Sequence, residues 1–172
     1  MRPPAADFWP RLRRAIEHGI RLWALAGGGL LLAVMAVNVL AVGLGILGSS
    51  FPGDVELTEV GVAVAAFAFL PYVQLVEGNV TADIFTQRAG PRVLAGLRAI
   101  AALVALLFAI LLLWRMFEGM LDQRAYRYVT AVLQFPLWQA FVPALMSLAL
   151  LCLAAALTLH RAIWDLVRKH DR

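Results

Sequence analysis

The sequence has little of what disulfide scaffolds, metal sites and soluble domains are made from. Charged residues are 15% of its 172 residues, whereas soluble domains have roughly 25%. Its single cysteine, Cys152, cannot form a disulfide within the chain. The three histidines, His18, His160 and His170, lie near the chain ends without the paired spacing of metal ligands. We therefore expect no disulfide framework and no metal site.

Motifs of nucleotide, haem and hydrolase sites are missing as well. The glycine clusters are not followed by Lys-Ser or Lys-Thr, as a phosphate-binding loop requires. Membrane haem anchors use histidines inside their spans, and none lies there. Ser147 lies in an apolar run with no histidine at a similar depth, so we expect it to hydrogen-bond its own backbone. These absences predict no enzyme activity and no cofactor.

Hydrophobic residues are abundant instead. They make up 62% of the chain, against roughly 45–50% in soluble domains. They form long runs with few charges, which is typical of membrane proteins. About 20 apolar residues cross a ~30 Å hydrocarbon layer as a helix. The sequence predicts an all-α integral membrane protein with four transmembrane helices, at about 22–47, 57–76, 93–115 and 137–159.

The segment before the first span is basic and amphipathic. Phe8, Leu12, Ile16 and Ile20 recur every four residues among several arginines. This pattern predicts a short helix in residues 1–21 that lies in the cytoplasmic membrane interface, with a solvated basic tail as the alternative. We expect the rest, 22–172, to form the four-helix membrane domain. The uncharged run is longer than the roughly 7–15 residues of a signal peptide core, which favours an uncleaved anchor.

The basic residues are distributed unevenly between the two sides. Twelve of the 15 Lys and Arg residues lie before the first span, between the second and third spans, or after the fourth. The positive-inside rule then predicts cytoplasmic termini, and external turns near 51–54 and 123–128. Because a membrane topology accounts for these residues, the net charge of +4 does not indicate a nucleic-acid partner.

A few polar side chains lie within or beside the predicted spans. Asn38 lies near the middle of the first span, where an amide usually hydrogen-bonds a neighbouring helix. Glu59 lies just inside the second span, and Glu77 lies near its end. Such carboxylates either pair with a neighbouring helix or chain, or face water at the interface.

The segment from the second span to the next connection carries a recognisable pattern. An acidic residue, Glu59, is followed by the aromatic-rich run at 67–70 and by a polar stretch that ends at Asp83. This pattern resembles the small membrane subunit, DctQ, of tripartite ATP-independent periplasmic (TRAP) transporters. The sequence at 135–138, Phe-Pro-Leu-Trp, also resembles that family's entry to its fourth span. The chain has Asn79 where the family often has histidine, and Ala82 where it often has valine.

The resemblance implies a set of partners in the bacterial inner membrane. A large permease subunit of such transporters carries the substrate and sodium sites, and a periplasmic solute-binding protein delivers the substrate. The substrate is commonly a carboxylate such as a dicarboxylate, taken up by symport. The small subunit would then act as a scaffold for the large one. The substrate itself is not encoded in this chain.

Two groups of residues are candidates for these contacts. We expect the large subunit to contact polar residues in or near the first two spans, namely Asn38, Glu59, Glu77 and Asp83. We expect the binding protein to dock on external charged residues, namely Asp54, Glu56, Arg124 and Arg127. Two alternatives remain open at this point: a self-assembling channel or carrier with Asn38, Glu59 and Gln74 along its path, or a membrane anchor of an enzyme complex.

Overall fold

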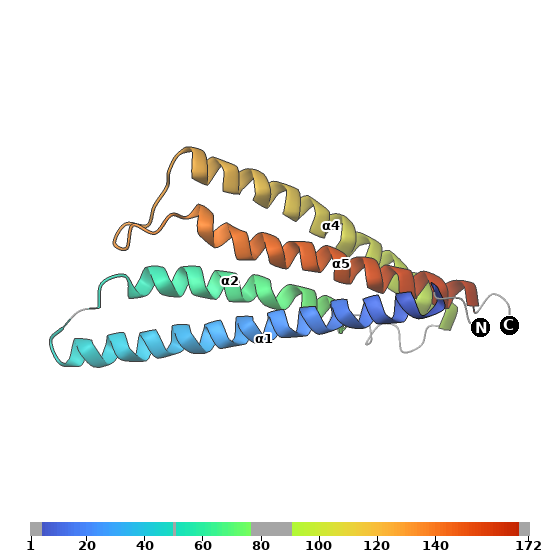
Figure 1. Ribbon diagram of the computed structural model, residues 1–172, viewed down its shortest axis with the longest axis horizontal. Helices are drawn as coiled ribbons and strands as arrows, with labels where there is room; N and C mark the ends of the chain where they lie inside the picture. The colour runs from blue at the N-terminus through green and yellow to red at the C-terminus, as the bar shows by residue number, and fades with distance from the viewer. Residues whose placement is uncertain (1–4, 50, 77–90, 169–172) are drawn as a thin grey trace.

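The computed structural model describes residues 5–49, 51–76 and 91–168 of the chain. This part forms four helices (Figure 1), which are α1 (Ala5–Ile46), α2 (Asp54–Leu75), α4 (Pro91–Ala125) and α5 (Trp138–Arg168). All four are long and apolar enough to cross a membrane. The described residues contain no strand, only an isolated bridge between Val129 and Pro136. The predicted all-α fold with four membrane-length helices is confirmed.

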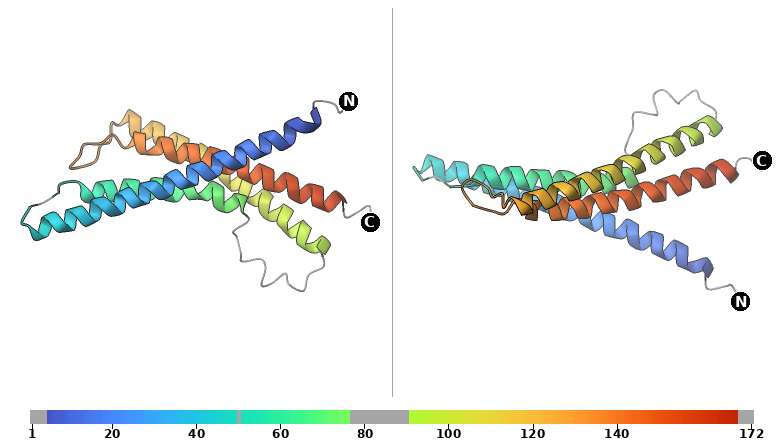
Figure 2. Two further views of the ribbon diagram at one scale, coloured as in Figure 1. Left: turned by 60° about the horizontal axis from the view of Figure 1, so that its bottom comes forward. Right: turned by 90° about the horizontal axis from the view of Figure 1, so that it is seen from above.

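The helices form an open array, not a closed bundle. Helix α2 packs against both α1 and α5, and α4 packs mainly against α5. Helix α1 crosses the other helices at an angle and approaches α5 over a short stretch (Figure 2). We call this stretch the crossing; it contains Glu17, Trp23, Ser147 and Arg161. The start of α1 and the end of α5 lie at one end of the array, and the turns after α1 and α4 lie at the other, which we call the loop end (Figure 1).

Glycine and alanine allow the helices to approach one another closely. A Cβ at Gly27 would lie 2.8 Å from the Cβ of Ala68, so only glycine fits between α1 and α2. Gly61 of α2 similarly lies against the Val34 side chain of α1. Helix packing in lipid depends on close van der Waals contact, because lipid tails are as apolar as the side chains. These small residues therefore provide the contact surface between α1 and α2.

Helix α1 is longer and more continuous than expected. Its 42 residues run without interruption through residue 21, where the sequence predicted a division between two elements. Ile20 is fully buried and packs with Leu75 and Ala154, and Ile16 packs against the same cluster. Ile16 and Ile20, expected to face the lipid surface, thus face other helices, whereas Leu12 is exposed. Extending an existing helix needs no new nucleus, which favours continuity; an interfacial location of 1–21 stays a prediction.

The loop end has a defined conformation. Gly53 precedes α2 with φ 89°, and a Cβ there would lie 2.5 Å from Leu133 Cγ. The segment between α4 and α5 turns back on itself, with Thr130 N–H donating to Phe135 O over 3.0 Å. Leu137 N–H donates to Tyr128 O over 3.1 Å and closes the turn. Glycine at position 53 therefore lets this loop lie directly on the start of α2.

Candidate functional site

Asn38 is hydrogen-bonded within the chain. Its Nδ2 donates to Thr58 Oγ1 on α2 over 2.7 Å and to Val34 O over 2.8 Å. The Thr58 hydroxyl donates in turn to Asp54 O over 2.8 Å. The predicted hydrogen bond to a neighbouring helix is confirmed. This amide therefore joins α1 to α2, and any contact of Asn38 with a large subunit stays a prediction.

Ser147 links α5 to α1. Its hydroxyl donates to Pro143 O over 2.8 Å, which is the backbone bond expected from the sequence. Trp23 Nε1 also donates to Ser147 Oγ over 2.9 Å, and Ser147 is fully buried. The sequence did not reveal this second bond because the two residues are far apart in the chain. Ser147 thus takes part in a helix-to-helix contact, with no histidine beside it among the described contacts.

Two further polar contacts join the spans. Gln74 Nε2 donates to Thr158 Oγ1 over 3.1 Å, between α2 and α5. Glu17 accepts from Arg13 over 2.8 Å and pairs with Arg161 of α5. Gln74, Asn38 and Ser147 therefore form separate helix-to-helix contacts and do not converge on one site. No group of three potential metal ligands occurs among the described residues.

Glu59 lies on the outer surface of α2. It is exposed, and it has no ion-pair or hydrogen-bond partner among the described residues. It borders a hollow of about 310 Å³ between α2, α4 and α5, together with Phe67, Met116 and Phe141. A lone carboxylate beside an apolar surface is available to a group on another chain.

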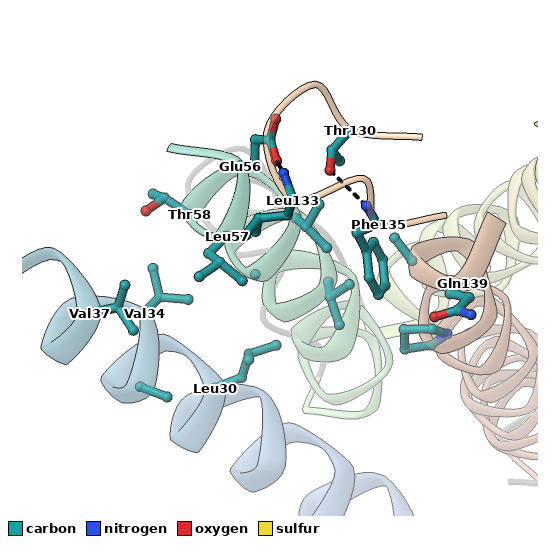
Figure 3. A pocket seen from close by; sticks show the side chains of 16 residues that line it. Leu30, Val34, Val37, Glu56, Leu57, Thr58, Thr130, Leu133, Phe135 and Gln139 are labelled. Atoms are coloured by element: carbon teal, nitrogen blue, oxygen red, sulfur yellow. Dashed lines mark hydrogen bonds between the residues drawn. The ribbon is translucent and has the colours of Figure 1, made fainter. Parts of the chain in front are cut away.

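Glu56 holds the loop between α4 and α5. Its two carboxylate oxygens accept hydrogen bonds from Val132 N over 2.7 Å and Leu133 N over 2.9 Å (Figure 3). The Glu56 carboxylate thus binds this chain's own backbone, and its contact with a binding protein stays a prediction. The Asp54 carboxylate, by contrast, accepts from its neighbour Val55 N over 2.9 Å, at the exposed start of α2.

The remaining candidate residues are separated from one another. The Arg124 guanidinium carbon lies 5.5 Å from the centroid of the Trp138 ring, a cation–π contact between α4 and α5. Arg127 is exposed and adopts φ 53° in the loop. Glu77 and Asp83 lie outside the described residues. The described residues thus place Asp54, Arg124 and Arg127 at the loop end without joining them into a cluster.

A larger hollow lies between α1, α2 and α5 at the loop end; we call it the slot. Its volume is about 360 Å³. Figure 3 shows Leu30 and Val34 of α1 on one side and Leu57 of α2 on the other, with Glu56 and Leu133 at the outer end. Its lining is almost entirely apolar and consists of Leu30, Ala33, Val34, Val37, Glu56, Leu57, Thr58, Val60, Gly61, Val64, Thr130, Leu133, Phe135, Gln139, Ala140 and Pro143.

Four membrane-length helices whose polar groups bond to one another define a multi-pass membrane protein. A family model described as tripartite ATP-independent periplasmic transporters, DctQ component, matches residues 31–164. The chain belongs to this family: it is the small membrane subunit of a TRAP transporter. Members of this family are transporter components, so the chain is not an enzyme. No curated protein and no solved structure matched the chain.

Proposed function

We propose that this chain is a static scaffold for the large permease subunit in the bacterial inner membrane. The complex would use an ion gradient to take up a carboxylate solute delivered by a periplasmic binding protein. The observation that carries this proposal is the pairing of polar side chains between helices. Asn38 bonds to Thr58, Trp23 to Ser147, and Gln74 to Thr158. Such pairs stabilise a fixed arrangement and leave no polar path among the described residues.

The proposed contact with the large subunit lies on the α2–α4 side of the array. Helix α4 packs mainly on α5, so much of its surface is free to contact another chain. Ile100, Val104, Leu107 and Leu111 are exposed along that helix. Glu59 lies on the same side, at the hollow between α2 and α4. Glu59 would pair with a basic or polar group of the large subunit. From the family resemblance, Glu77 and Asp83 would make contacts of the same kind.

The proposed orientation places the chain ends in the cytoplasm. Both ends lie at the same end of the array (Figure 1), as an even number of spans requires. The excess of basic residues on that side supports this orientation. The loop end would then face the periplasm, where Asp54, Arg124 and Arg127 are available to the binding protein. Glu56 would contribute there by fixing the loop's shape.

The carrier alternative would require its polar residues to converge. Asn38 and Gln74 instead face different neighbouring helices, and Glu59 lies on the outer surface. A sodium or substrate site requires several oxygens in one place. The structure gives no observation that favours this second function over the scaffold.

Reconstitution in liposomes tests the scaffold proposal. The purified chain with a binding protein should give no solute uptake under a sodium gradient, and addition of the large subunit should restore it. Sodium-driven uptake by this chain alone, above that of empty liposomes, would contradict the proposal.

The interface is tested by Glu59→Leu, with Asp122→Leu as the control. Both side chains are exposed carboxylates, but Asp122 lies near the end of α4, away from the α2–α4 hollow. We expect Glu59→Leu to lower the yield of purified complex and Asp122→Leu to leave it unchanged. Equal yields of complex for Glu59→Leu and the unmodified chain would contradict the proposal that Glu59 lies in the interface.

A further inference from the structure

The slot has one closed end and one polar end. At the crossing, the Trp23–Ser147 hydrogen bond joins α1 to α5 and closes the space between them. Toward the loop end these helices separate, and α2 forms the floor of the slot. The polar lining residues come from the outer turns of α2 and α5 and from the loop, namely Glu56, Thr58, Thr130 and Gln139. The slot is therefore apolar in the membrane interior and polar near its surface.

The length of the slot matches one leaflet. Glu56 and Val64 bound it along α2, and eight residues of helix rise about 12 Å. One leaflet contributes roughly half of the ~30 Å hydrocarbon layer, or about 15 Å. An occupant that entered from the loop-end surface would thus end near the middle of the membrane, at the crossing.

The crossing obstructs a transmembrane helix in the slot. A spanning helix would have to continue past the crossing, where Trp23 and Ser147 are in contact. A hydrocarbon chain is far thinner than a helix and can end at the midplane, so it can occupy the slot without passing the crossing.

The charge at the outer end indicates which lipid is bound. Glu56 is the only charged residue among the described residues that line the slot, and Asp54 lies two positions before it. No Lys or Arg occurs in that lining. Carboxylates at the outer end favour a headgroup with a cation and repel a purely anionic one.

We propose that the slot binds one acyl chain of a phospholipid with an ammonium headgroup, such as phosphatidylethanolamine, in the leaflet at the loop end. The outer leaflet follows from the proposed orientation, whereas the binding itself requires only that the helices span a membrane. The bound acyl chain fills the space between α1 and α5 that no protein side chain fills. The lipid is thus a structural component of the subunit at the loop end.

Filling the slot provides the first test. Ala33 lines it, whereas Ala36, on the same helix, is exposed and lies outside it. The complex with the large subunit is purified from nanodiscs of phosphatidylethanolamine and phosphatidylglycerol, washed with detergent, and its bound lipids are counted by native mass spectrometry. Ala33→Phe should retain one phospholipid fewer per complex than the unmodified chain, and Ala36→Phe should retain the full number. Equal retention by both variants would overturn the proposal.

Headgroup preference provides the second test. Asp54→Lys should reduce the preference for phosphatidylethanolamine over phosphatidylglycerol by about fivefold, as expected for reversing one charge at a solvated surface. Asp122→Lys, with the same charge change away from the slot, should leave the preference unchanged. An unaltered preference in Asp54→Lys would contradict the assignment of the headgroup.

A partner helix in the slot would give a different result. A single cysteine at Val37→Cys, in a Cys152→Ala background, should not cross-link to the large subunit, because lipid occupies the slot. Efficient cross-linking there would overturn the lipid proposal while supporting a scaffold role. Assembly and uptake are measured separately, so failure of the lipid proposal is distinguishable from failure of the proposed function.

Discussion

The crossing and the loop end hold the helices together in different ways. At the crossing, α1 and α5 touch directly through Glu17–Arg161 and Trp23–Ser147, with Ile20 buried between helices. At the loop end, α1 and α5 are apart; Asn38 pairs with Thr58 between α1 and α2, and Glu56 holds the loop between α4 and α5 on α2. Side-chain pairs therefore join α1 directly to α5 in one region, whereas backbone N–H groups of a loop also hold the helices in the other. Changes at the crossing should affect the whole fold, and changes at the loop end should act locally.

The largest expected effect comes from Gly27→Leu. The added side chain has no room beside Ala68, so it should force α1 away from α2. Overpacking costs roughly 1–3 kcal/mol in well-packed cores. Thermal unfolding of the purified chain should show a lower midpoint. Gly28→Leu is the control, because a Cβ there meets no atom within 4 Å. If both variants lowered the midpoint equally, the close contact between α1 and α2 at Gly27 would not explain the effect.

The next effect concerns the ion pair at the crossing. Glu17→Gln leaves the Arg161 guanidinium without its anion, and the Arg161 Nε is already buried without a partner among the described residues. Both side chains keep some exposure, so we expect a loss of about 1–2 kcal/mol, below that of a fully buried pair. Chemical denaturation of each variant measures this loss in the free energy of unfolding. Arg13→Gln should cost less, because Arg13 contacts Glu17 on the same helix; an equal cost would show that the pair between helices is unimportant.

Glu56→Gln should have a local effect. The amide puts an NH2 donor where one carboxylate oxygen now accepts, so either the Val132 N–H or the Leu133 N–H loses the acceptor that it faces. Hydrogen exchange at these two amides should become several-fold faster, while the global unfolding midpoint stays unchanged. Glu118→Gln, which breaks an exposed pair with Arg115, should not alter that exchange. A lower global midpoint in Glu56→Gln would contradict the separation of the two regions.

The smallest effect expected at the crossing is that of Trp23→Phe. The substitution removes one hydrogen bond to Ser147 and keeps an aromatic ring. Hydrogen bonds between membrane helices contribute about 0.6 kcal/mol on average. A slightly lower unfolding midpoint should result, and combination with Ser147→Ala should add little more. Fully additive losses would show that the two residues act independently.

The helices could be predicted from the sequence because each depends on a local property. Long apolar runs with few charges indicated the four spans, and the bond of Asn38 followed from the cost of an unpaired amide in lipid. The partners of Glu56 and Trp23 could not be predicted, because they lie on segments distant in the chain. Only the packing of α1, α2 and α5 brings these residues together. The sequence likewise gave no sign that Ile16 and Ile20 face protein instead of lipid.

The uninterrupted length of α1 has a mechanical consequence. Residues 5–21 continue the axis of the first span, which gives the helix an arm about 25 Å long beyond residue 21. If that span tilted by about 10° about residue 21, the arm's tip would move by roughly 4 Å. The Glu17–Arg161 pair couples this arm to α5 near its base. The continuity of α1 therefore transmits any tilt of the membrane span to the start of the helix.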